Sequence, residues 1–337
     1  MKILVTGGLG FIGSHTVVAL QNKGYEVIII DNLSNSSLQV MEGITNITSK
    51  TPIFKKLDVR NKSELESFFL RHQDIEGVIH FAASKAVGES VENPLLYYEN
   101  NLASLVYLLQ NMVQLKKQNL IFSSSCTVYG EADNLPVLEE AEVKKAISPY
   151  GNTKQIGEEI LKDTCSAYNH LRAISLRYFN PIGAHPSSHI GELPLGIPQN
   201  LVPFITQTAS GKRESLSVFG DDYPTKDGTC IRDYIHVMDL AEAHVVALER
   251  LMSSKSEKQY EVFNVGTGVG SSVLEVIDAF ERASGETLNY QVVNRRPGDV
   301  VAAYADTTKA NEVLGWKAKR DLTQALKDAW KWEKNQS

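Results

Sequence analysis

The segment LVTGGLGFIGSHTV, residues 4–17, places Gly7, Gly10 and Gly13 directly after an apolar run and at the start of a helical pattern. This strand–turn–helix setting predicts a dinucleotide site, because the glycines permit a tight turn and the close approach of a diphosphate. The N-terminus of the following helix offers free N–H groups and a favourable dipole to that anion. A purely structural turn is the alternative interpretation of the same glycines.

Asp31 ends the second apolar run and is the candidate partner of an adenosine ribose. A carboxylate there accepts hydrogen bonds from the 2′- and 3′-hydroxyls and repels a 2′-phosphate. The residues after it, NLSNSS, include no arginine that could bind such a phosphate, so the pattern favours NAD over NADP. Asp58, at the end of the third run in LDVRN, is expected to meet the adenine amino group. A strand-end turn or a helix cap is the alternative for Asp58.

The first half of the chain alternates short Val/Ile/Leu-rich runs with amphipathic segments. We expect strands at Ile3–Val5, Val27–Ile30, Ile53–Leu57, Val78–Phe81, Leu120–Phe122 and Ala173–Leu176, and helices near residues 12–22, 62–71, 95–116 and 150–169. Near-continuous apolar strands that alternate with helices predict an α/β fold with a doubly wound, Rossmann-like parallel sheet.

The pattern changes in the segment NPIGAHPSSHIGELPLGIPQNLVP, residues 180–203, which contains five prolines and three glycines. Such a segment breaks both helical and strand periodicity, and a loop of this length is usually functional or a linker. Shorter mixed elements follow, with helices expected near residues 237–252 and 271–283. We therefore expect a nucleotide-binding domain over residues 1–180 and a smaller mixed lobe over residues 181–337.

Composition and charge narrow the classes of protein further. The chain has 34 basic and 40 acidic residues, a formal charge of −6, and no block of Lys or Arg. This balance argues against a nucleic-acid-binding or anionic-membrane surface. The three cysteines, Cys126, Cys165 and Cys230, are widely spaced, which favours a reducing compartment. With neither a signal-peptide pattern nor an apolar run of ~20 residues, the sequence predicts a soluble cytoplasmic protein.

Tyr150 and Lys154, in PYGNTK, lie one helical turn apart and would project from the same helix face. Tyrosine has a pKa near ~10 and is a poor base at neutral pH, but a lysine and a cationic nicotinamide would both stabilise its phenolate. Ser123, Ser124 and Ser125 follow an expected strand at the carboxyl edge of the sheet, where such sheets bind ligands. A surface pair and a solvated serine loop are the alternatives. In combination with the glycine turn, the set predicts catalysis.

Several segments together resemble the UDP-glucose 4-epimerase branch of the extended short-chain dehydrogenase/reductase family. They are TGGLGFIGSHTV, HFAASKAVGES, SSSCTVYG, SPYGNTK, RYFNPIGAHP, RDYIHVMDLA and RRPGD, and they extend over nearly the whole chain. The resemblance implies an isomerase that inverts C4 of UDP-hexoses through a transient 4-keto sugar, with NAD regenerated in each cycle. It also implies that residues 181–337 form the UDP-sugar-binding lobe.

The resemblance further implies roles for individual residues. Tyr150 would take the proton of the sugar 4-hydroxyl, Ser125 would hydrogen-bond that oxygen, and Lys154 would lower the pKa of Tyr150 and hold the nicotinamide ribose. The expected NAD-binding residues are Gly7, Gly10, Phe11, Ile12, Gly13, Asp31, Asn32, Asn35, Asp58, Val59, Phe81, Ala82, Lys85, Asn100, Tyr150, Lys154 and Tyr178. A core aromatic is the alternative for Phe81, and solvated surface is the alternative for Lys85 and Asn100.

A second set of residues is implied for the substrate. Its members are Ser125, Tyr150, Asn180, Asn200, Leu201, Arg232, Arg296, Asp299 and Ala303. Arg232 and Arg296 would clamp the diphosphate, a task suited to planar, permanently charged donors, and Asp299 would receive the uridine ribose hydroxyls. Ala303, in RRPGDVVAAYADTTK, would line the pocket beside the sugar C2 substituent, where a small residue admits an N-acetyl group. A one-residue slip in register would place Tyr304 there instead.

Competing interpretations concern metal binding, a related reaction, and a protein without catalysis. His185 and His189 lie four apart in a proline-rich loop without further ligands, so we expect no metal site. A nucleotide-sugar 4,6-dehydratase needs an acid–base pair beside the serine, where this chain has Cys126 and Thr127. A regulator that only senses NAD would not need Ser125, Tyr150 and Lys154 together.

A homodimer is also expected, built from the helices near residues 95–116 and 150–169. Their apolar residues exceed what one sheet face obviously needs, although packing within the monomer could use them. The residues in question are Leu102, Leu105, Leu109, Ile156, Ile160 and Leu161.

Overall fold

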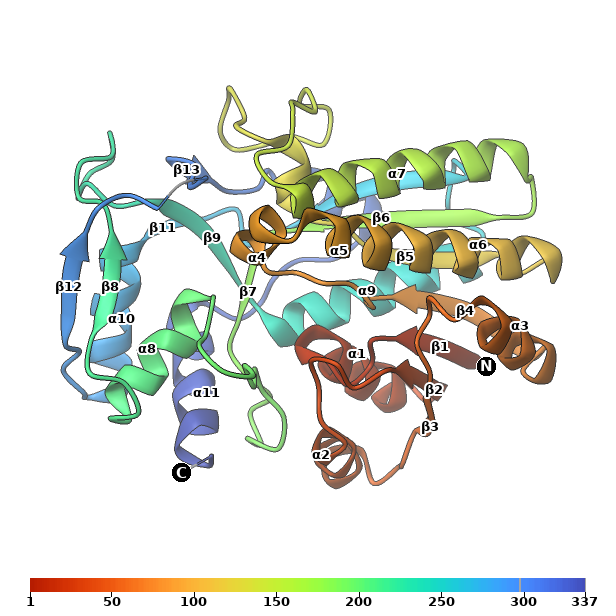
Figure 1. Ribbon diagram of the computed structural model, residues 1–337, viewed down its shortest axis with the longest axis horizontal. Helices are drawn as coiled ribbons and strands as arrows, with labels where there is room; N and C mark the ends of the chain where they lie inside the picture. The colour runs from red at the N-terminus through yellow and green to blue at the C-terminus, as the bar shows by residue number, and fades with distance from the viewer. Residues whose placement is uncertain (297, 337) are drawn as a thin grey trace.

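The computed structural model describes residues 1–296 and 298–336, and a seven-stranded parallel sheet dominates it (Figure 1). The strand order is β10-β6-β5-β4-β1-β2-β3. The strands are β1 (Lys2–Thr6), β2 (Glu26–Asp31), β3 (Ile53–Lys56), β4 (Ile75–His80), β5 (Asn119–Ser123), β6 (Arg172–Tyr178) and β10 (Tyr260–Val265). All neighbouring strands pair in parallel, so the expected doubly wound sheet is confirmed.

Helices cover both faces of this sheet, because successive residues of each strand point to opposite faces. Ile3 and Val5 of β1 belong to one apolar core and Leu4 to the other. The first core is completed by α1 (Phe11–Asn22), α2 (Gln39–Thr48) and α9 (Val237–Met252). The second is completed by α3 (Lys62–Arg71), α6 (Ser104–Gln114) and α7 (Pro149–Ala167). The helix expected near residues 95–116 consists of α5 (Pro94–Tyr98), a π-helical turn η1 (Glu99–Ala103) and α6.

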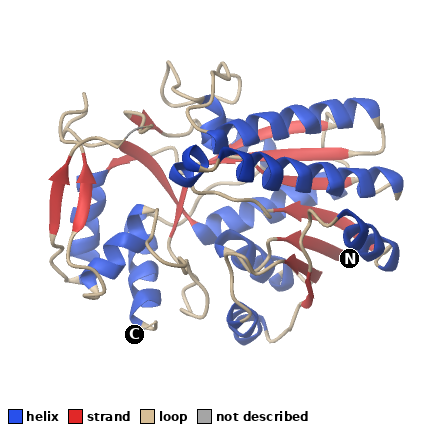
Figure 2. Cartoon of the chain, in the orientation of Figure 1, coloured by secondary structure: helices blue, strands red, loops and turns tan. Residues whose placement is uncertain are grey.

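A smaller lobe lies beside the large sheet, at the left of Figure 2. It contains one sheet built from β7 (Asn180–Ile182), β9 (Ile231–His236), β11 (Gly270–Ser272) and β13 (Ala302–Ala303), and a second from β8 (Leu216–Phe219) and β12 (Tyr290–Val293). The helices α8 (Leu201–Ala209), α10 (Val273–Ser284) and α11 (Leu322–Lys334) enclose a third apolar core around Phe280 and Trp330. Short helical segments are α4 (Val87–Glu92), η2 (Cys126–Tyr129) and η3 (Ala310–Leu314).

The sheet also uses chain from beyond residue 180. Strand β10 pairs with β6 at the edge of the large sheet, and α9 packs on α1 within the first core. The division of the chain near residue 180 stays a prediction, but the large sheet takes elements from both sides of it. The chain therefore crosses between the two parts more than once.

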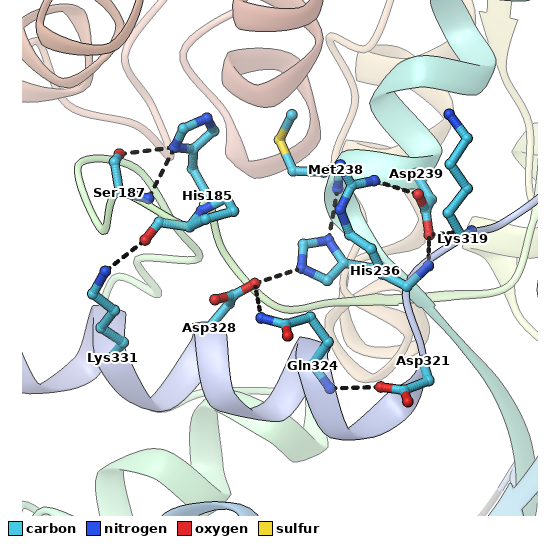
Figure 3. A network of polar contacts seen from close by, with 12 residues as sticks. His185, Ser187, His236, Met238, Asp239, Lys319, Asp321, Gln324, Asp328 and Lys331 are labelled. Carbon is cyan, nitrogen blue, oxygen red and sulfur yellow. Dashed lines mark hydrogen bonds and ion pairs between the residues drawn. The ribbon is translucent and has the colours of Figure 1, made fainter.

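A buried polar network joins the two parts where β9 leads into α9 (Figure 3). His236 caps α9, since its Nδ1 accepts a hydrogen bond from the Met238 N–H at 3.0 Å. Its Nε2 lies 3.1 Å from Asp328 on α11. Nearby, Asp239 of α9 is paired with Arg320, just before α11. The C-terminal helix is thus attached by polar contacts to the helix that covers the large sheet.

Candidate active site

The three glycines form the turn between β1 and α1. Gly7 has φ of +68°, and a Cβ there would lie 2.8 Å from the backbone nitrogen of Ala82. A Cβ on Gly13 would lie 2.2 Å from the carbonyl oxygen of Gly7, so only glycine fits at this position. Helix α1 begins at Phe11, and the N–H groups of its first turn have no partner within the helix. This cradle fits a diphosphate, because it offers N–H donors with no side chain in front of the backbone.

The Asp31 carboxylate lies beside this turn at the end of β2. Its Oδ2 accepts a hydrogen bond from the Leu9 N–H at 3.1 Å. Its Oδ1 accepts from the Leu33 N–H at 2.9 Å and from the Ser36 hydroxyl at 2.8 Å. The carboxylate is buried and held from two loops at once. It is therefore fixed at the end of β2, where a ribose partner is expected.

Asp58, after β3, forms a two-point ion pair with Arg60. The Arg60 Nε and NH2 nitrogens lie 3.0 and 2.8 Å from its two carboxylate oxygens, and the Asn32 amide donates at 3.1 Å. The hydrogen bonds from Arg60 lower the pKa of Asp58 to about 2. An adenine amino group would have to share these acceptors, so the expected role of Asp58 stays a prediction. Near it, Val59 is buried and Asn35 is exposed.

Tyr150 and Lys154 lie on the first turns of α7. Ser148 caps this helix, since its side chain accepts a hydrogen bond from the Gly151 N–H at 3.1 Å. Both Tyr150 and Lys154 are buried. The Lys154 ammonium donates to the Ser123 carbonyl oxygen at 2.6 Å and lies 5.8 Å from the centroid of the Tyr150 ring. The lysine thus connects the tyrosine-bearing helix to the serine turn after β5.

The three serines of that turn have different partners. The Ser123 hydroxyl hydrogen-bonds the Tyr178 hydroxyl, and the Ser124 hydroxyl donates to Glu158 at 2.5 Å. The Ser125 side chain caps η2, where it accepts a hydrogen bond from the Thr127 N–H at 3.2 Å, and it lies close enough to Tyr150 to lower the pKa of that hydroxyl. The structure therefore brings together Ser125, Tyr150 and Lys154, which the sequence places on two separate segments.

Burial affects the two titratable members of this set in opposite ways. It raises the pKa of Tyr150, and the neighbouring Tyr178 adds to that rise, while the nearby Ser125 hydroxyl opposes it. Burial lowers the pKa of Lys154 to about 8, and the nearby Glu158 carboxylate opposes that change. In both cases the charged form is the one that burial disfavours. The expected effect of Lys154 on the Tyr150 pKa stays a prediction.

Phe81 and Ala82 follow β4, and Tyr178 ends β6 on the other side of β5, so all three lie at the carboxyl edge of the sheet. Phe81 and Ala82 come directly after β4, against the glycine turn. The Phe81 ring also lies 4.7 Å from the His244 ring of α9, so it is partly a core aromatic. Tyr178 ends β6 and is buried, which raises its pKa to about 12. These residues therefore lie at the edge of the sheet that also carries the glycine turn.

Lys85 and Asn200 meet at Glu192, a residue that the sequence did not single out. The Lys85 ammonium lies 3.3 Å from Glu192 Oε1, and the Asn200 amide donates to the same oxygen at 2.7 Å. Asn200 directly precedes α8, whose first residue is Leu201, and its side chain makes no capping hydrogen bond to that helix. Glu192 therefore links the loop after β4 to the smaller lobe.

Two further expected ligand residues lie on separate elements. The Asn100 amide, in the π-helical turn η1, donates to the Ser84 hydroxyl at 3.0 Å. Asn180, expected in a loop, begins the short strand β7 and pairs with Tyr234 of β9.

Arg232, Arg296 and Asp299 come together in the smaller lobe. Arg296 reaches both Asp299 oxygens, with Nε at 3.1 Å and NH2 at 2.9 Å. The Arg232 NH2 lies 3.7 Å from Asp299 Oδ1. The charge of Arg232 also lowers the pKa of the Cys126 thiol against the larger effect of burial, which places this guanidinium near the serine turn. The expected clamp is therefore assembled, with Asp299 between its arginines.

Ala303 lies on β13, opposite Arg232 of β9 in a parallel register. Ala303 and Cys126 both pack on the same small apolar cluster around Val128 and Phe179. The Tyr304 ring lies on the other side of the strand, over Gly270, where an added Cβ would be 3.0 Å from its Cδ1. Ala303 thus packs on the apolar cluster that Cys126 also contacts, and its expected place beside the sugar C2 substituent stays a prediction.

Metal binding and membrane insertion find no structural support in the part of the chain that the structure describes. No group of three or more His, Cys, Asp or Glu residues there could hold a metal ion. The His185 Nδ1 lies 2.8 Å from the Ser187 hydroxyl, and His189 is exposed. None of the helices within residues 1–296 and 298–336 has the length and apolarity to cross a bilayer.

A parallel sheet whose glycine turn adjoins a buried serine, tyrosine and lysine is the arrangement of a short-chain dehydrogenase/reductase. A family model described as GDP-mannose 4,6 dehydratase matches residues 4–329. UDP-glucose 4-epimerase from Bacillus subtilis (strain 168) is 50% identical over 99% of this chain and 97% of its own length.

Solved structures give the same result. UDP-glucose 4-epimerase from Stenotrophomonas maltophila, with bound NAD and formylated UDP-arabinopyranose, superposes with a TM-score of 0.96 at 46% identity and covers 100% of this chain and 98% of that one. The enzyme from Bifidobacterium longum, in complex with NAD+ and UDP, gives 0.95 at 45% identity, with 99% and 98% covered. The chain belongs to the nucleotide-sugar family that the matching family model describes and, within it, to the UDP-glucose 4-epimerases.

Sequence reasoning missed some residues that organise the site, chiefly Glu158, Arg177 and Glu192. Glu158 follows Lys154 by one helical turn in YGNTKQIGEEI, so its place on the Tyr150 face of the helix was a readable signal. Arg177 precedes Tyr178 on a buried strand, where a charged residue requires a partner. Glu192 gave no such signal, because its two partners come from distant parts of the chain.

Proposed function

We propose that this protein is an NAD-dependent UDP-hexose 4-epimerase that interconverts UDP-glucose and UDP-galactose. The observation that carries the proposal is the buried contact between Ser125 and Tyr150, with Lys154 one turn further along α7, at the sheet edge that holds the glycine turn. A positioned base and a hydroxyl donor at this edge are what proton removal from a sugar alcohol requires.

In this proposal the residues divide the work by position. NAD, when bound, would accept the hydride of sugar C4 and return it to the other face, which makes the 4-keto sugar transient. Tyr150 would hold the proton of the 4-hydroxyl, and Ser125 would share a hydrogen bond with the same oxygen. Lys154, anchored on the Ser123 carbonyl, would place a positive charge beside Tyr150. The cradle of the glycine turn and the Asp31 carboxylate would hold the two halves of the cofactor.

The smaller lobe would bind the UDP part of the substrate. Arg232 and Arg296 supply two guanidinium groups to a diphosphate, and Asp299 holds them close to each other. Asn180, Asn200 and Leu201 would complete the nucleotide side of the pocket. The proposed division of labour is a cofactor domain over residues 1–180, with the Ser/Tyr/Lys set, and a substrate lobe over residues 181–337.

We further propose that the enzyme accepts UDP-GlcNAc and UDP-GalNAc. Ala303 carries only a methyl group and packs with Cys126 beside the serine turn. A small residue there leaves room for an acetamido group on sugar C2, whereas a tyrosine would overlap with it.

The dehydratase alternative is not favoured by this site. Elimination of water needs an acid and a base beside the serine, and η2 presents Cys126 and Thr127 there. Burial raises the pKa of the Cys126 thiol to about 11, so it offers no thiolate base at neutral pH. A protein that only senses NAD would gain nothing from the buried Lys154, which burial disfavours in its charged form.

The test is to incubate purified protein with UDP-glucose and to follow UDP-galactose by proton NMR. We expect an equilibrium mixture of the two sugars without net consumption of NAD. A 4-keto-6-deoxy product would support the dehydratase, and absence of any turnover in protein that binds NAD would support the sensor.

We also propose a homodimer, with a contact surface that differs in part from the one expected from the sequence. Leu105, Leu109 and Leu161 are buried within the monomer, because α6 and α7 pack on the sheet. Apolar side chains remain exposed on α4 and α5, beside α7: Val91 is 61% and Leu95 81% accessible. Burial of this surface against a second copy would remove it from water. Light scattering that gave a monomer mass at micromolar concentration would contradict the dimer.

We propose the cytoplasm as the site of action. All three cysteines are free thiols, as a reducing compartment allows. Cell fractionation tests this location. Recovery of the protein outside the cytoplasmic fraction would contradict it.

A further inference from the structure

Glu158 lies on the same face of α7 as Tyr150 and Lys154, one turn after the lysine and two turns after the tyrosine. All three side chains are buried. A carboxylate at this depth needs a partner, because an isolated buried charge is costly. Its partners show what it holds in place.

Two residues on successive turns of α7 hold the turn that carries Ser125. Glu158 Oε1 accepts a hydrogen bond from the Ser124 hydroxyl at 2.5 Å. The Lys154 ammonium donates to the carbonyl oxygen of the preceding residue, Ser123, at 2.6 Å. Both contacts fall on the residues directly before Ser125. The helix that carries Tyr150 is therefore tied to the Ser125 turn at two adjacent points.

Arg177 of β6 completes the cluster with a two-point ion pair. Its Nε lies 2.9 Å from Glu158 Oε1, and its NH2 lies 2.6 Å from Oε2. A third nitrogen, NH1, donates to the Glu139 carbonyl oxygen at 3.1 Å, and the guanidinium lies 4.8 Å from the Tyr129 ring centroid. A buried ion pair is weak evidence for stability, because apolar residues of similar volume often stabilise as well. What the pair provides here is a fixed orientation of the Glu158 carboxylate toward Ser124.

We propose that Glu158 is a positioning residue for the epimerase reaction: held by Arg177, it fixes the Ser125 turn against the helix that carries Tyr150 and Lys154. This inference rests on the proposed function. Ser125 and Tyr150 must meet the same sugar oxygen, and they come from separate elements. Without the tie to Ser124, the hydrogen bonds that hold α7 to this part of the chain are those of Lys154 to the Ser123 carbonyl oxygen and of the Gln155 amide to the Val128 carbonyl oxygen, and neither reaches Ser124 or Ser125.

The same carboxylate also acts on Lys154 through its charge. Burial lowers the pKa of Lys154, and Glu158 is the group that opposes this. The other charged or titratable groups near the two are Arg177 from β6, Tyr129 from η2, Tyr260 from β10, His80 from β4 and Tyr150 from α7. The Arg177 charge is paired with Glu158, so removal of both charges together leaves no unpaired guanidinium at Arg177. Lys154 would then keep its proton over a narrower pH range.

Two variants separate these effects, and a third serves as control. Ser124→Ala removes the tie but leaves the ion pair. Glu158→Gln/Arg177→Gln removes both charges but leaves an acceptor for Ser124. Glu159→Gln makes the same chemical change at the neighbouring, exposed position of α7 and should behave as the wild type. For each protein we would measure kcat and KM for UDP-galactose, bound NAD, and kcat as a function of pH.

We expect Ser124→Ala to lower kcat by about tenfold to 10²-fold, as a displaced catalytic group would, with KM and bound NAD within twofold of the wild type. In the double variant we expect the alkaline limb of the kcat profile to move to lower pH. Wild-type kcat in Ser124→Ala would overturn the proposal. An unshifted alkaline limb in the double variant would also overturn it. So would parallel changes of kcat, KM and bound NAD in Ser124→Ala, which a merely structural role predicts. If the wild type itself does not epimerise UDP-galactose, the proposed function is wrong. If the wild type is active and Ser124→Ala is equally active, the proposed function stands and only the role of Glu158 is refuted.

Discussion

Replacement of Tyr150 by phenylalanine separates the chemistry of this residue from its packing. The ring is buried against α5 and η2, and phenylalanine keeps its volume. The substitution removes only the hydroxyl group, so we expect the free energy of unfolding to change by about 1 kcal/mol. For a chain of 337 residues such a change shifts Tm by only about 1–2 °C. Bound NAD should persist, because the glycine turn and Asp31 are untouched.

Turnover should respond far more strongly than stability. The loss of acid–base help costs ~10²–10⁴-fold in kcat, or about 3–5 kcal/mol of barrier. The assay is interconversion of UDP-glucose and UDP-galactose by proton NMR, with Tm and released NAD measured on the same preparations. Tyr168→Phe, at the exposed C-terminal end of α7, is the matched control and should retain wild-type turnover. A Tyr150→Phe enzyme within about threefold of wild-type kcat would refute Tyr150 as the base.

Three other properties of the site can be tested directly. Purified protein should carry NAD that survives dialysis and is released by acid. Gly13→Ala should lose this NAD, because the added Cβ would lie 2.2 Å from the Gly7 carbonyl oxygen. Wild-type protein that is active without bound nucleotide and does not respond to added NAD would contradict this prediction. Ala303→Tyr should abolish turnover of UDP-GlcNAc and largely spare UDP-glucose in a comparison of kcat/KM, and a wild type inactive on UDP-GlcNAc would exclude the open pocket. As the pH falls from 10.5 through about 8, the wild type should lose stability, because Lys154 takes up a proton in the unfolded state before it does so in the folded state. Lys154→Met has no such group, so its free energy of unfolding should rise relative to that of the wild type over this pH range. Denaturant titrations at matched NAD content would measure this difference, and a pH-independent one would be the contrary result.

The elements that the sequence predicts well are those whose signal is local. Strand β1, the glycine turn and α1 occupy one continuous segment, and the two periodicities within it already specify a strand and a helix. Helix α9 is expected over residues 237–252 and has those bounds. Its location does not follow from the sequence, because it covers the large sheet and does not belong to the smaller lobe's core. Amphipathicity shows that a helix has a buried face but does not show which sheet it covers.

The helices expected to form a dimer also show that an apolar helix face does not identify the surface that covers it. The apolar residues of α6 and α7 look surplus in the sequence, yet Leu105, Leu109 and Leu161 fill the core under the sheet. Exposed apolar residues lie on α4 and on α5, which is the first part of the helix expected near residues 95–116, and Leu102, Ile156 and Ile160 are half-buried. A count of apolar positions on a helix does not distinguish a second buried face from a wide first one. That distinction depends on how closely α5, α6 and α7 pack on each other and on the sheet.

The two halves of the site differ in how far topology alone predicts them. The ends of β1, β4, β5 and β6 are neighbours in the sheet, so Gly7, Phe81, Ser125 and Tyr178 must meet at one edge once a parallel sheet in this order is accepted. The substrate side has no such rule. Arg232 and Ala303 face each other only because β13 pairs with β9 in one particular register, and a slip of one residue would turn Tyr304 toward the serine turn. Strand β13 spans only Ala302–Ala303, too short for any alternation to reveal its register. Topology therefore accounts for part of the cofactor side, whereas the expected sugar pocket depends on the resemblance, and Ala303 is the residue proposed to determine which UDP-hexoses enter it.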